Sequence, residues 1–190
     1  MRKKGLVTGL LVMVSVVVVN AQRITVASDK AADTDFSKFK TFYWTSQVDN
    51  QLDEGYNFLN DLILKAQVRD AVKAELMGLG YKLNPDSPDL LVNFRVFDKP
   101  VRLRGTEGYG TSYWGNDQYR SISDTTSYAV EAGTLLISLV DRKEGAIVWQ
   151  GFASGLIDNN QFIKDEGKIR EAVNMIFDEY GLRAKEYSRK

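Results

Sequence analysis

Two segments with helical periodicity, separated by segments with strand periodicity, constrain the fold of this chain most strongly. In the first, Asn60 or Asp61 supplies an N-cap and Gly78 and Gly80 end the helix. Its apolar residues recur every three or four positions: Leu64, Val68, Ala71, Val72, Leu76 and Leu79. The second segment runs from about residue 165 to 180 and ends before Gly181 as the C-cap, with the apolar stripe Ile169, Ala172, Val173, Ile176, Phe177 and Tyr180. Each pattern predicts a helix that packs one face against another element.

Strand periodicity is clearest between residues 90 and 97. Leu90, Val92, Phe94 and Val96 alternate there with a mixed set of residues, which predicts one core face. Residues 134–140 and 146–153 form a second pair of strand patterns, and the turn 141–145 between them ends in Gly145, which predicts a hairpin. Further strands are expected at 23–28, 39–44 and 81–83.

The order of these elements predicts the fold class. Strands, a helix, more strands including a hairpin and a final helix indicate an α+β fold, with a mostly antiparallel sheet and the two main helices packed on one face. We expect one domain over residues 22–181, followed by a basic C-terminal tail at 182–190. The periodicity does not give the strand order.

Residues 105–128 interrupt the strand pattern and form a Gly/Tyr-rich stretch with one aliphatic residue, Ile122. Such a composition buries little aliphatic core and predicts a flexible loop within the domain. Its aromatic residues are the candidate binding site: Tyr109, Tyr113, Trp114 and Tyr119. These rings either fold back over the sheet or stack on a sugar, a peptide or a partner surface.

The N-terminus has the pattern of an export signal. Three basic residues at positions 2–4 precede an apolar run from Gly5 to Val19, and Ala21 ends a small-residue cleavage site. The alternative is a membrane anchor, but a spanning helix needs about 20 apolar residues and this run is shorter. We therefore expect a signal peptide at 1–21 and localisation in the periplasm or cell envelope of a diderm bacterium, or secretion. Cleavage would leave 22 basic against 25 acidic side chains, a net charge of −3.

The chain contains no histidine and no cysteine. This composition excludes Ser-His-Asp and Cys-His catalysis, the usual zinc ligands and disulfides, so the fold depends on an ordinary hydrophobic core. No clustered basic excess lies outside the termini, which argues against nucleic acid as a partner. No cofactor or metal site is expected, since no calcium-loop motif is present either.

Carboxylates are the remaining candidates for catalysis. Three local pairs occur: Asp86 with Asp89, Asp141 with Glu144, and Asp165 with Glu166. Paired carboxylates carry out glycoside hydrolysis when their environments separate their pKa values. All three pairs lie at predicted turns or helix starts, however, where Asp and Glu are favoured by capping. The alternatives for these pairs are therefore hydrolysis and local structure.

Five stretches, in this order, give the chain a resemblance to a bacterial envelope family, domain of unknown function 4136: Asp35–Trp44, Glu75–Tyr81, Pro88–Val92, Gly133–Asp141 and Val148–Gly151. The resemblance covers nearly all of residues 22–190 and implies an exported, often lipid-anchored protein without an assigned activity. It implies no catalytic residues, and Trp44, Trp149 and Gly151 are expected to serve packing and turns. The residue after the predicted cleavage is Gln22, not the cysteine that lipid-anchored members carry. This difference favours a soluble periplasmic or secreted form.

Two functions follow as hypotheses. The first is a non-enzymatic envelope protein that binds or scaffolds another envelope protein or a glycan, with the 105–128 loop as the contact. The alternative is a carboxylate-dependent hydrolase acting on envelope glycan. The C-terminal residues 182–190, with four basic side chains, are either a solvated tail or a contact to anionic polymer or lipid.

Overall fold

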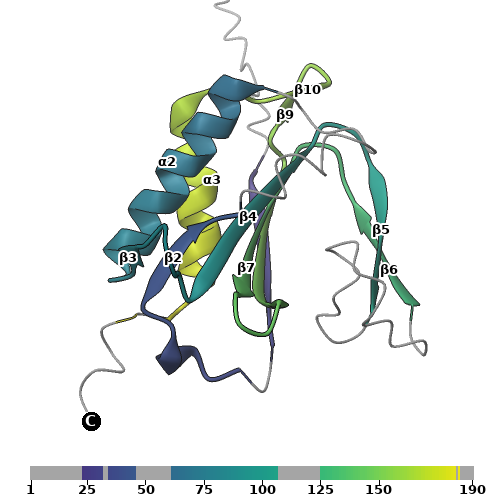
Figure 1. The fold of residues 1–190 in the computed structure, drawn as a ribbon. Coiled ribbons are helices and arrows are strands. Elements are labelled where there is room, and N and C mark those ends of the chain that lie inside the picture. Colours follow the sequence, from purple (N-terminus) through teal and green to yellow (C-terminus); the bar gives the residue numbers. More distant parts are fainter. Residues whose placement is uncertain (1–22, 32–33, 46–60, 107–124, 183, 185–190) are drawn as a thin grey trace, which may run out of the picture.

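The computed structural model describes residues 23–31, 34–45, 61–106, 125–182 and 184. It confirms the α+β class: a mixed six-stranded sheet carries two helices on one face (Figure 1). The strands of this sheet, in spatial order, are β1 (Thr25–Lys30), β8 (Ala146–Ser154), β7 (Thr134–Asp141), β4 (Leu90–Phe97), β2 (Thr41–Trp44) and β3 (Lys82–Leu83).

Strand direction divides the sheet into two parts. The pairs β1–β8, β8–β7 and β7–β4 are antiparallel, whereas β2 is parallel to both β4 and β3. The parallel part follows from the chain order, because a helix lies between β2 and β3 and a helical crossover returns the chain in the same direction. The hairpin predicted between β7 and β8 is present, and Gly145 in its turn has φ +66°.

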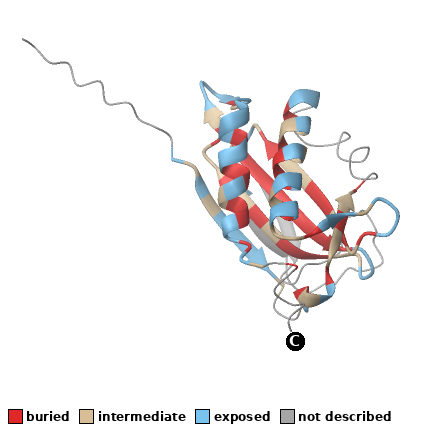
Figure 2. Ribbon diagram, turned by 90° about the vertical axis from the view of Figure 1, so that its left-hand side faces the viewer, coloured by how far each residue is buried: buried red, intermediate tan, exposed pale blue. Residues whose placement is uncertain are grey.

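Both predicted helices are present. α2 spans Leu62–Gly78 with Asp61 as its N-cap, and α3 spans Glu166–Asp178 with Asp165 as its N-cap. The C-cap of α3 is Glu179 rather than the predicted Gly181, which lies two residues further on with φ +63°. The helices lie side by side over the sheet, and the residues on their outward faces are exposed (Figure 2).

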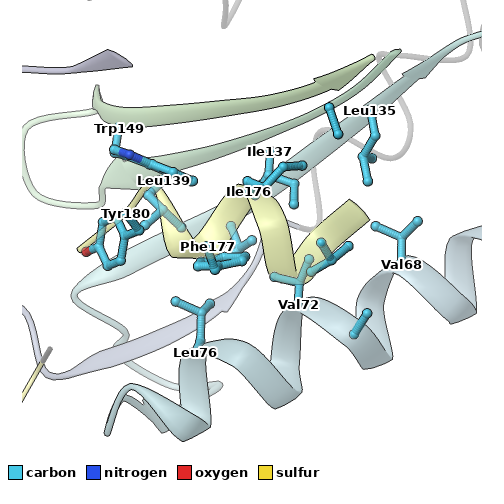
Figure 3. Packing of buried hydrophobic residues seen from close by; sticks show 14 of the residues in the cluster. Val68, Val72, Leu76, Leu135, Ile137, Leu139, Trp149, Ile176, Phe177 and Tyr180 are labelled. Carbon is cyan, nitrogen blue, oxygen red and sulfur yellow. The ribbon is translucent and has the colours of Figure 1, made fainter. Parts of the chain in front are cut away.

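The main core lies between the helices and the sheet. It includes the predicted stripes of both helices and the side of β4 that carries Leu90, Val92 and Val96. Figure 3 shows Val68, Val72 and Leu76 of α2 and Ile176 and Phe177 of α3 beneath Leu135, Ile137 and Leu139 of β7. Trp149 of β8 is 1% exposed and packs edge-on against Tyr180, with ring centroids 4.9 Å apart.

Segments at both ends of the domain close this core. A short 3-10 helix, η1 (Phe36–Lys38), has Asp35 as its N-cap and buries Phe36 against Tyr180. After α3, Ala184 is buried, and its backbone N–H donates to the carbonyl oxygen of Leu79 at 3.0 Å. The chain therefore remains packed against the end of α2 beyond the last helix.

A two-stranded arm extends the hairpin formed by β4 and β7. β5 (Val101–Thr106) and β6 (Thr125–Val130) pair antiparallel with each other and lead away from the helices (Figure 1). The bounds predicted for the loop, 105–128, are wrong at both ends, because its first two and last four residues lie in strands. Residues 107–124 lie outside the described residues. Two further short strands, β9 (Ile157–Asp158) and β10 (Gln161–Phe162), pair with each other before α3.

Candidate functional site

The four aromatic residues selected from the sequence, Tyr109, Tyr113, Trp114 and Tyr119, lie outside the described residues. The structure does show how the stretch that carries them begins and ends. Thr106, the last residue of β5, is the direct cross-strand partner of Thr125, the first residue of β6. Residues 107–124, called the insertion below, connect these two residues in the sequence.

Asp89, from the first carboxylate pair, holds the start of β2. Its Oδ2 atom accepts hydrogen bonds from the backbone N–H groups of Lys40 and Thr41, at 2.8 and 2.9 Å, and from the Thr41 hydroxyl at 2.9 Å. Its pair partner Asp86 is exposed in the turn before β4. The Asp89 carboxylate thus links β2 to the beginning of its parallel neighbour β4.

Asp141, from the second pair, is nearly buried, with 4% of its side chain exposed. Its Oδ2 lies 2.7 Å from Nζ of Lys38, and its Oδ1 accepts the backbone N–H groups of Lys143 and Glu144 in the hairpin turn. Burial by itself raises the pKa of Asp141, but the hydrogen bonds from Lys38 and from the two backbone groups outweigh it and hold the pKa below its ordinary value. The same hydrogen bond raises the pKa of Lys38. Asp141 is therefore a charged turn residue that attaches η1 to the hairpin.

Asp165 and Glu166, the third pair, act at the start of α3. Asp165 Oδ1 accepts the backbone N–H of Lys168 at 2.9 Å, the geometry of an N-cap. Glu166 Oε1 lies 2.6 Å from Nη2 of Arg170 on the exposed helix surface. Each of the three pairs thus has at least one carboxylate bound to backbone N–H groups, as local structure predicts.

The sheet face opposite the helices carries a feature that the sequence analysis did not single out. Asn93, Ser138 and Gln150 are direct cross-strand neighbours on β4, β7 and β8. Asn93 and Ser138 are buried, and Gln150 Nε2 donates to the Ser138 hydroxyl at 3.0 Å. A sequence signal existed, because Asn93 and Ser138 are polar residues at the centres of otherwise apolar strands. The hydrogen bond between Gln150 and Ser138 joins β8 to β7 through side chains as well as backbone groups.

A second missed cluster lies at the edge of the core. Trp44 and Phe94 pack edge-on with ring centroids 6.2 Å apart, and the Arg69 guanidinium lies 4.8 Å from the Trp44 ring centroid. All three residues are partly exposed. A cation over a tryptophan face stabilises such a contact by about 0.5–1 kcal/mol, so the cluster fastens α2 to β2.

Across residues 23–31, 34–45, 61–106, 125–182 and 184, no group of three or more acidic residues is arranged to hold a metal ion. Within the same residues, neither helix is long and apolar enough to cross a membrane.

Comparison with known proteins identifies the family. The model of the family described as domain of unknown function, DUF4136, matches residues 26–180. The chain belongs to this family. The resemblance drawn from the five sequence stretches is thus confirmed, and the DUF4136 match extends from β1 to Tyr180, the aromatic residue that closes the core. Among curated protein sequences, none matches this chain.

Several solved structures are similar to this chain. A DUF4136 family protein from Bacteroides thetaiotaomicron is 18% identical, with a TM-score of 0.52, over 83% of this chain and 95% of that one. A PDZ domain protein from Parabacteroides distasonis is 18% identical (TM-score 0.47), over 84% of this chain and 36% of that one. A PelC dodecamer from Paraburkholderia phytofirmans is 10% identical (TM-score 0.43), over 85% and 99%. At 18% identity and a TM-score of 0.52, the likeness to the Bacteroides protein is one of fold alone.

Proposed function

We propose that this DUF4136 protein is exported and acts in the periplasm or cell envelope of a diderm bacterium as a non-enzymatic binding or scaffolding domain. The observation that carries the non-enzymatic role is the use of the carboxylates. Asp89, Asp141 and Asp165 each accept backbone N–H groups, which commits one member of every local pair to holding a turn or a strand. With histidine and cysteine absent from the sequence, acid-base or nucleophilic chemistry would have to use carboxylate, hydroxyl, lysine or tyrosine side chains.

The proposed contact is the insertion at the tip of the β5–β6 arm. Its four selected aromatic residues, Tyr109, Tyr113, Trp114 and Tyr119, would supply ring faces for a glycan or for a partner protein. The arm supports this role because it leads away from the helices and the main sheet (Figure 1). A binding segment in this place can change without disturbing the packed core.

Export is tested by the mature N-terminus. We expect mass spectrometry of the protein purified from its host to find a chain that begins at Gln22, and cell fractionation to find it outside the cytoplasm. Recovery of an uncleaved chain in the inner membrane would contradict the proposal, because it would mean that residues 1–21 act as an anchor.

Binding is tested by replacing the insertion. Because Thr106 and Thr125 are direct cross-strand partners, residues 107–124 can be replaced by Asn-Gly, a two-residue hairpin turn that keeps the arm in register. We expect this variant to keep the thermal stability of the parent and to lose at least tenfold in retention on isolated native cell envelopes. A second variant that changes only the four aromatic residues to serine should show the same loss.

A matched control is Lys73→Ala, which changes an exposed residue on the outer face of α2 and should leave retention unchanged. Equal retention of the parent and of both arm variants would contradict the binding role of the insertion. Release of soluble sugar fragments when the purified parent is incubated with envelope glycan would contradict the non-enzymatic role.

A further inference from the structure

The edge strands of this protein differ in how well they resist pairing with another chain. Edge strands normally carry charges or proline, or are very short, because their unpaired backbone groups can accept a new strand. The main sheet follows this rule: β1 carries Asp29 and Lys30, and β3 has two residues. The β9–β10 pair also has strands of two residues.

The arm has one protected edge and one unprotected edge. β5 carries Arg102 and Arg104, whereas β6 has the sequence Thr-Thr-Ser-Tyr-Ala-Val, without charge, proline or glycine. β-branched and aromatic residues make up four of its six positions, Thr125, Thr126, Tyr128 and Val130, and favour strand pairing. Among the described strands, β5 is the one that pairs with β6, and no other described strand lies along the second edge of β6.

A two-stranded ribbon is itself marginal in water. Three or more strands, or a packed face, are usually needed for a stable sheet. At its base the arm has packing, since Val130 is buried with Phe97 and Leu136. Towards its tip the register pairs Leu103 with Tyr128 and Arg104 with Ser127. Addition of strands at β6 would turn this two-stranded ribbon into a wider sheet.

From these observations we propose that β6 pairs antiparallel with β6 of a second copy of this chain, forming a four-stranded sheet of order β5–β6–β6–β5 across a two-fold axis. A second copy fits β6 because the strand has no charge, so self-pairing brings no like charges together, and threonine pairs across strands are favourable. Self-pairing at β5 would instead place Arg102 and Arg104 of the two copies at neighbouring cross-strand positions, which is unfavourable. This interface is independent of the proposed binding insertion and does not require that function.

Cysteine cross-linking tests the pairing directly, because the chain has no native cysteine. Single variants Thr126→Cys, Ser127→Cys and Tyr128→Cys are made in the full sequence, expressed with export and oxidised with copper phenanthroline. Antiparallel strands place opposite Cβ atoms about 5 Å apart, so at least one β6 position should form a disulfide-linked dimer in high yield. Arg102→Cys and Arg104→Cys should not, since the two β5 strands would lie three strand spacings apart, about 14 Å.

Sedimentation of the unmodified protein gives the second readout. We expect a monomer–dimer equilibrium, weakened at least tenfold by Ser127→Lys, which places like charges across the axis, and unchanged by Ala27→Lys on the edge strand β1. Because an isologous edge contact closes at two copies, a larger closed assembly would overturn the proposal. A strictly monomeric protein without a cross-linked dimer at any β6 position would also overturn it, as would dimers that form equally well through the β5 cysteines.

Discussion

The hydroxyl groups of Tyr81 and Tyr180 lie 2.8 Å apart in the buried core, so that one donates a hydrogen bond to the other. Tyr81 follows α2 and Tyr180 follows α3, and the two residues are 99 positions apart in the chain. Both are 3% exposed. The pair therefore joins the C-terminal ends of the two helices through polar atoms within an otherwise apolar layer.

Removing one of these hydroxyls should lower the free energy of unfolding by more than half of the amount that is lost when both are removed. Tyr81→Phe and Tyr180→Phe each take a partner from a buried hydroxyl, and each should lower the free energy of unfolding by about 1–3 kcal/mol. In the double variant no hydroxyl of the pair is left without its neighbour, so its cost should be smaller than the sum of the single costs. Urea unfolding of the four proteins measures this coupling. Additive losses would show that the two hydroxyls do not depend on each other.

Gly151 should tolerate no side chain. A Cβ atom there would lie 2.5 Å from Cγ2 of Ile176 and 2.5 Å from the Trp149 ring, which is too close for either to remain in place. Gly151→Ala should therefore destabilise the protein by about 1–3 kcal/mol through overpacking between α3 and the sheet. Gly78→Ala is the matched control, because nothing lies within 4 Å of its added Cβ and alanine favours the helix by about 0.5–1 kcal/mol. Thermal unfolding should shift in opposite directions for the two variants.

The Lys38–Asp141 pair should make the folding stability depend on pH in the acidic range. The folded state lowers the pKa of Asp141 below its ordinary value of 3.8, so the stabilisation is complete well above that value and is lost as the pH falls through the folded-state pKa. We expect Asp141→Asn to destabilise the protein by about 1–3 kcal/mol near pH 7 and to reduce the loss of stability below about pH 4.

Urea unfolding between pH 2.5 and 7 checks this expectation. Glu144→Gln is the control, because Glu144 is exposed in the same turn and donates only its backbone N–H to Asp141. Parallel pH profiles for the parent and Asp141→Asn would show that the lysine contact contributes nothing to acid sensitivity.

Substitutions of Asp89 and Asp86 should differ clearly in their effect on folding stability, although the two residues are close in the sequence. Asp89→Ala leaves the backbone N–H groups of Lys40 and Thr41 without their acceptor, and should cost about 2 kcal/mol of folding stability. Asp86→Ala changes an exposed side chain and should stay within about 0.5 kcal/mol of the parent. If the pair were catalytic rather than structural, both substitutions would leave stability nearly unchanged.

The local features of the fold were accessible from the sequence. The helix start at Asn60 or Asp61, the hairpin turn that ends in Gly145 and the core side of β4 were predicted and are present, with Asp61 as the N-cap. Each depends on interactions within a few residues or on the repeat of a single element. The candidate site stays a prediction, because its four aromatic residues lie outside the described residues. These residues also form no periodic pattern from which a structure could be predicted.

Long-range relationships could not be predicted in this way. Periodicity shows that Asn93 and Ser138 face one side of a strand or the other, but not that they meet across the sheet. Lys38 and Asp141 are 103 positions apart. The residues around each of them do not indicate that the two side chains meet. The same holds for Arg69, whose guanidinium covers the Trp44 ring.

By itself, the sequence determined the kind of elements, their order, the core face of each and the chemistries that a chain without histidine and cysteine cannot use. Only the tertiary structure decided the strand order, the parallel position of β2 beside β4, the approach of α3 to Gly151 and the pairing of β6 with β5. The physical reason is that the former follow from backbone sterics, capping and burial within one segment. The latter depend on which distant segments pack together, and the periodicity of one segment does not indicate which other segment lies beside it.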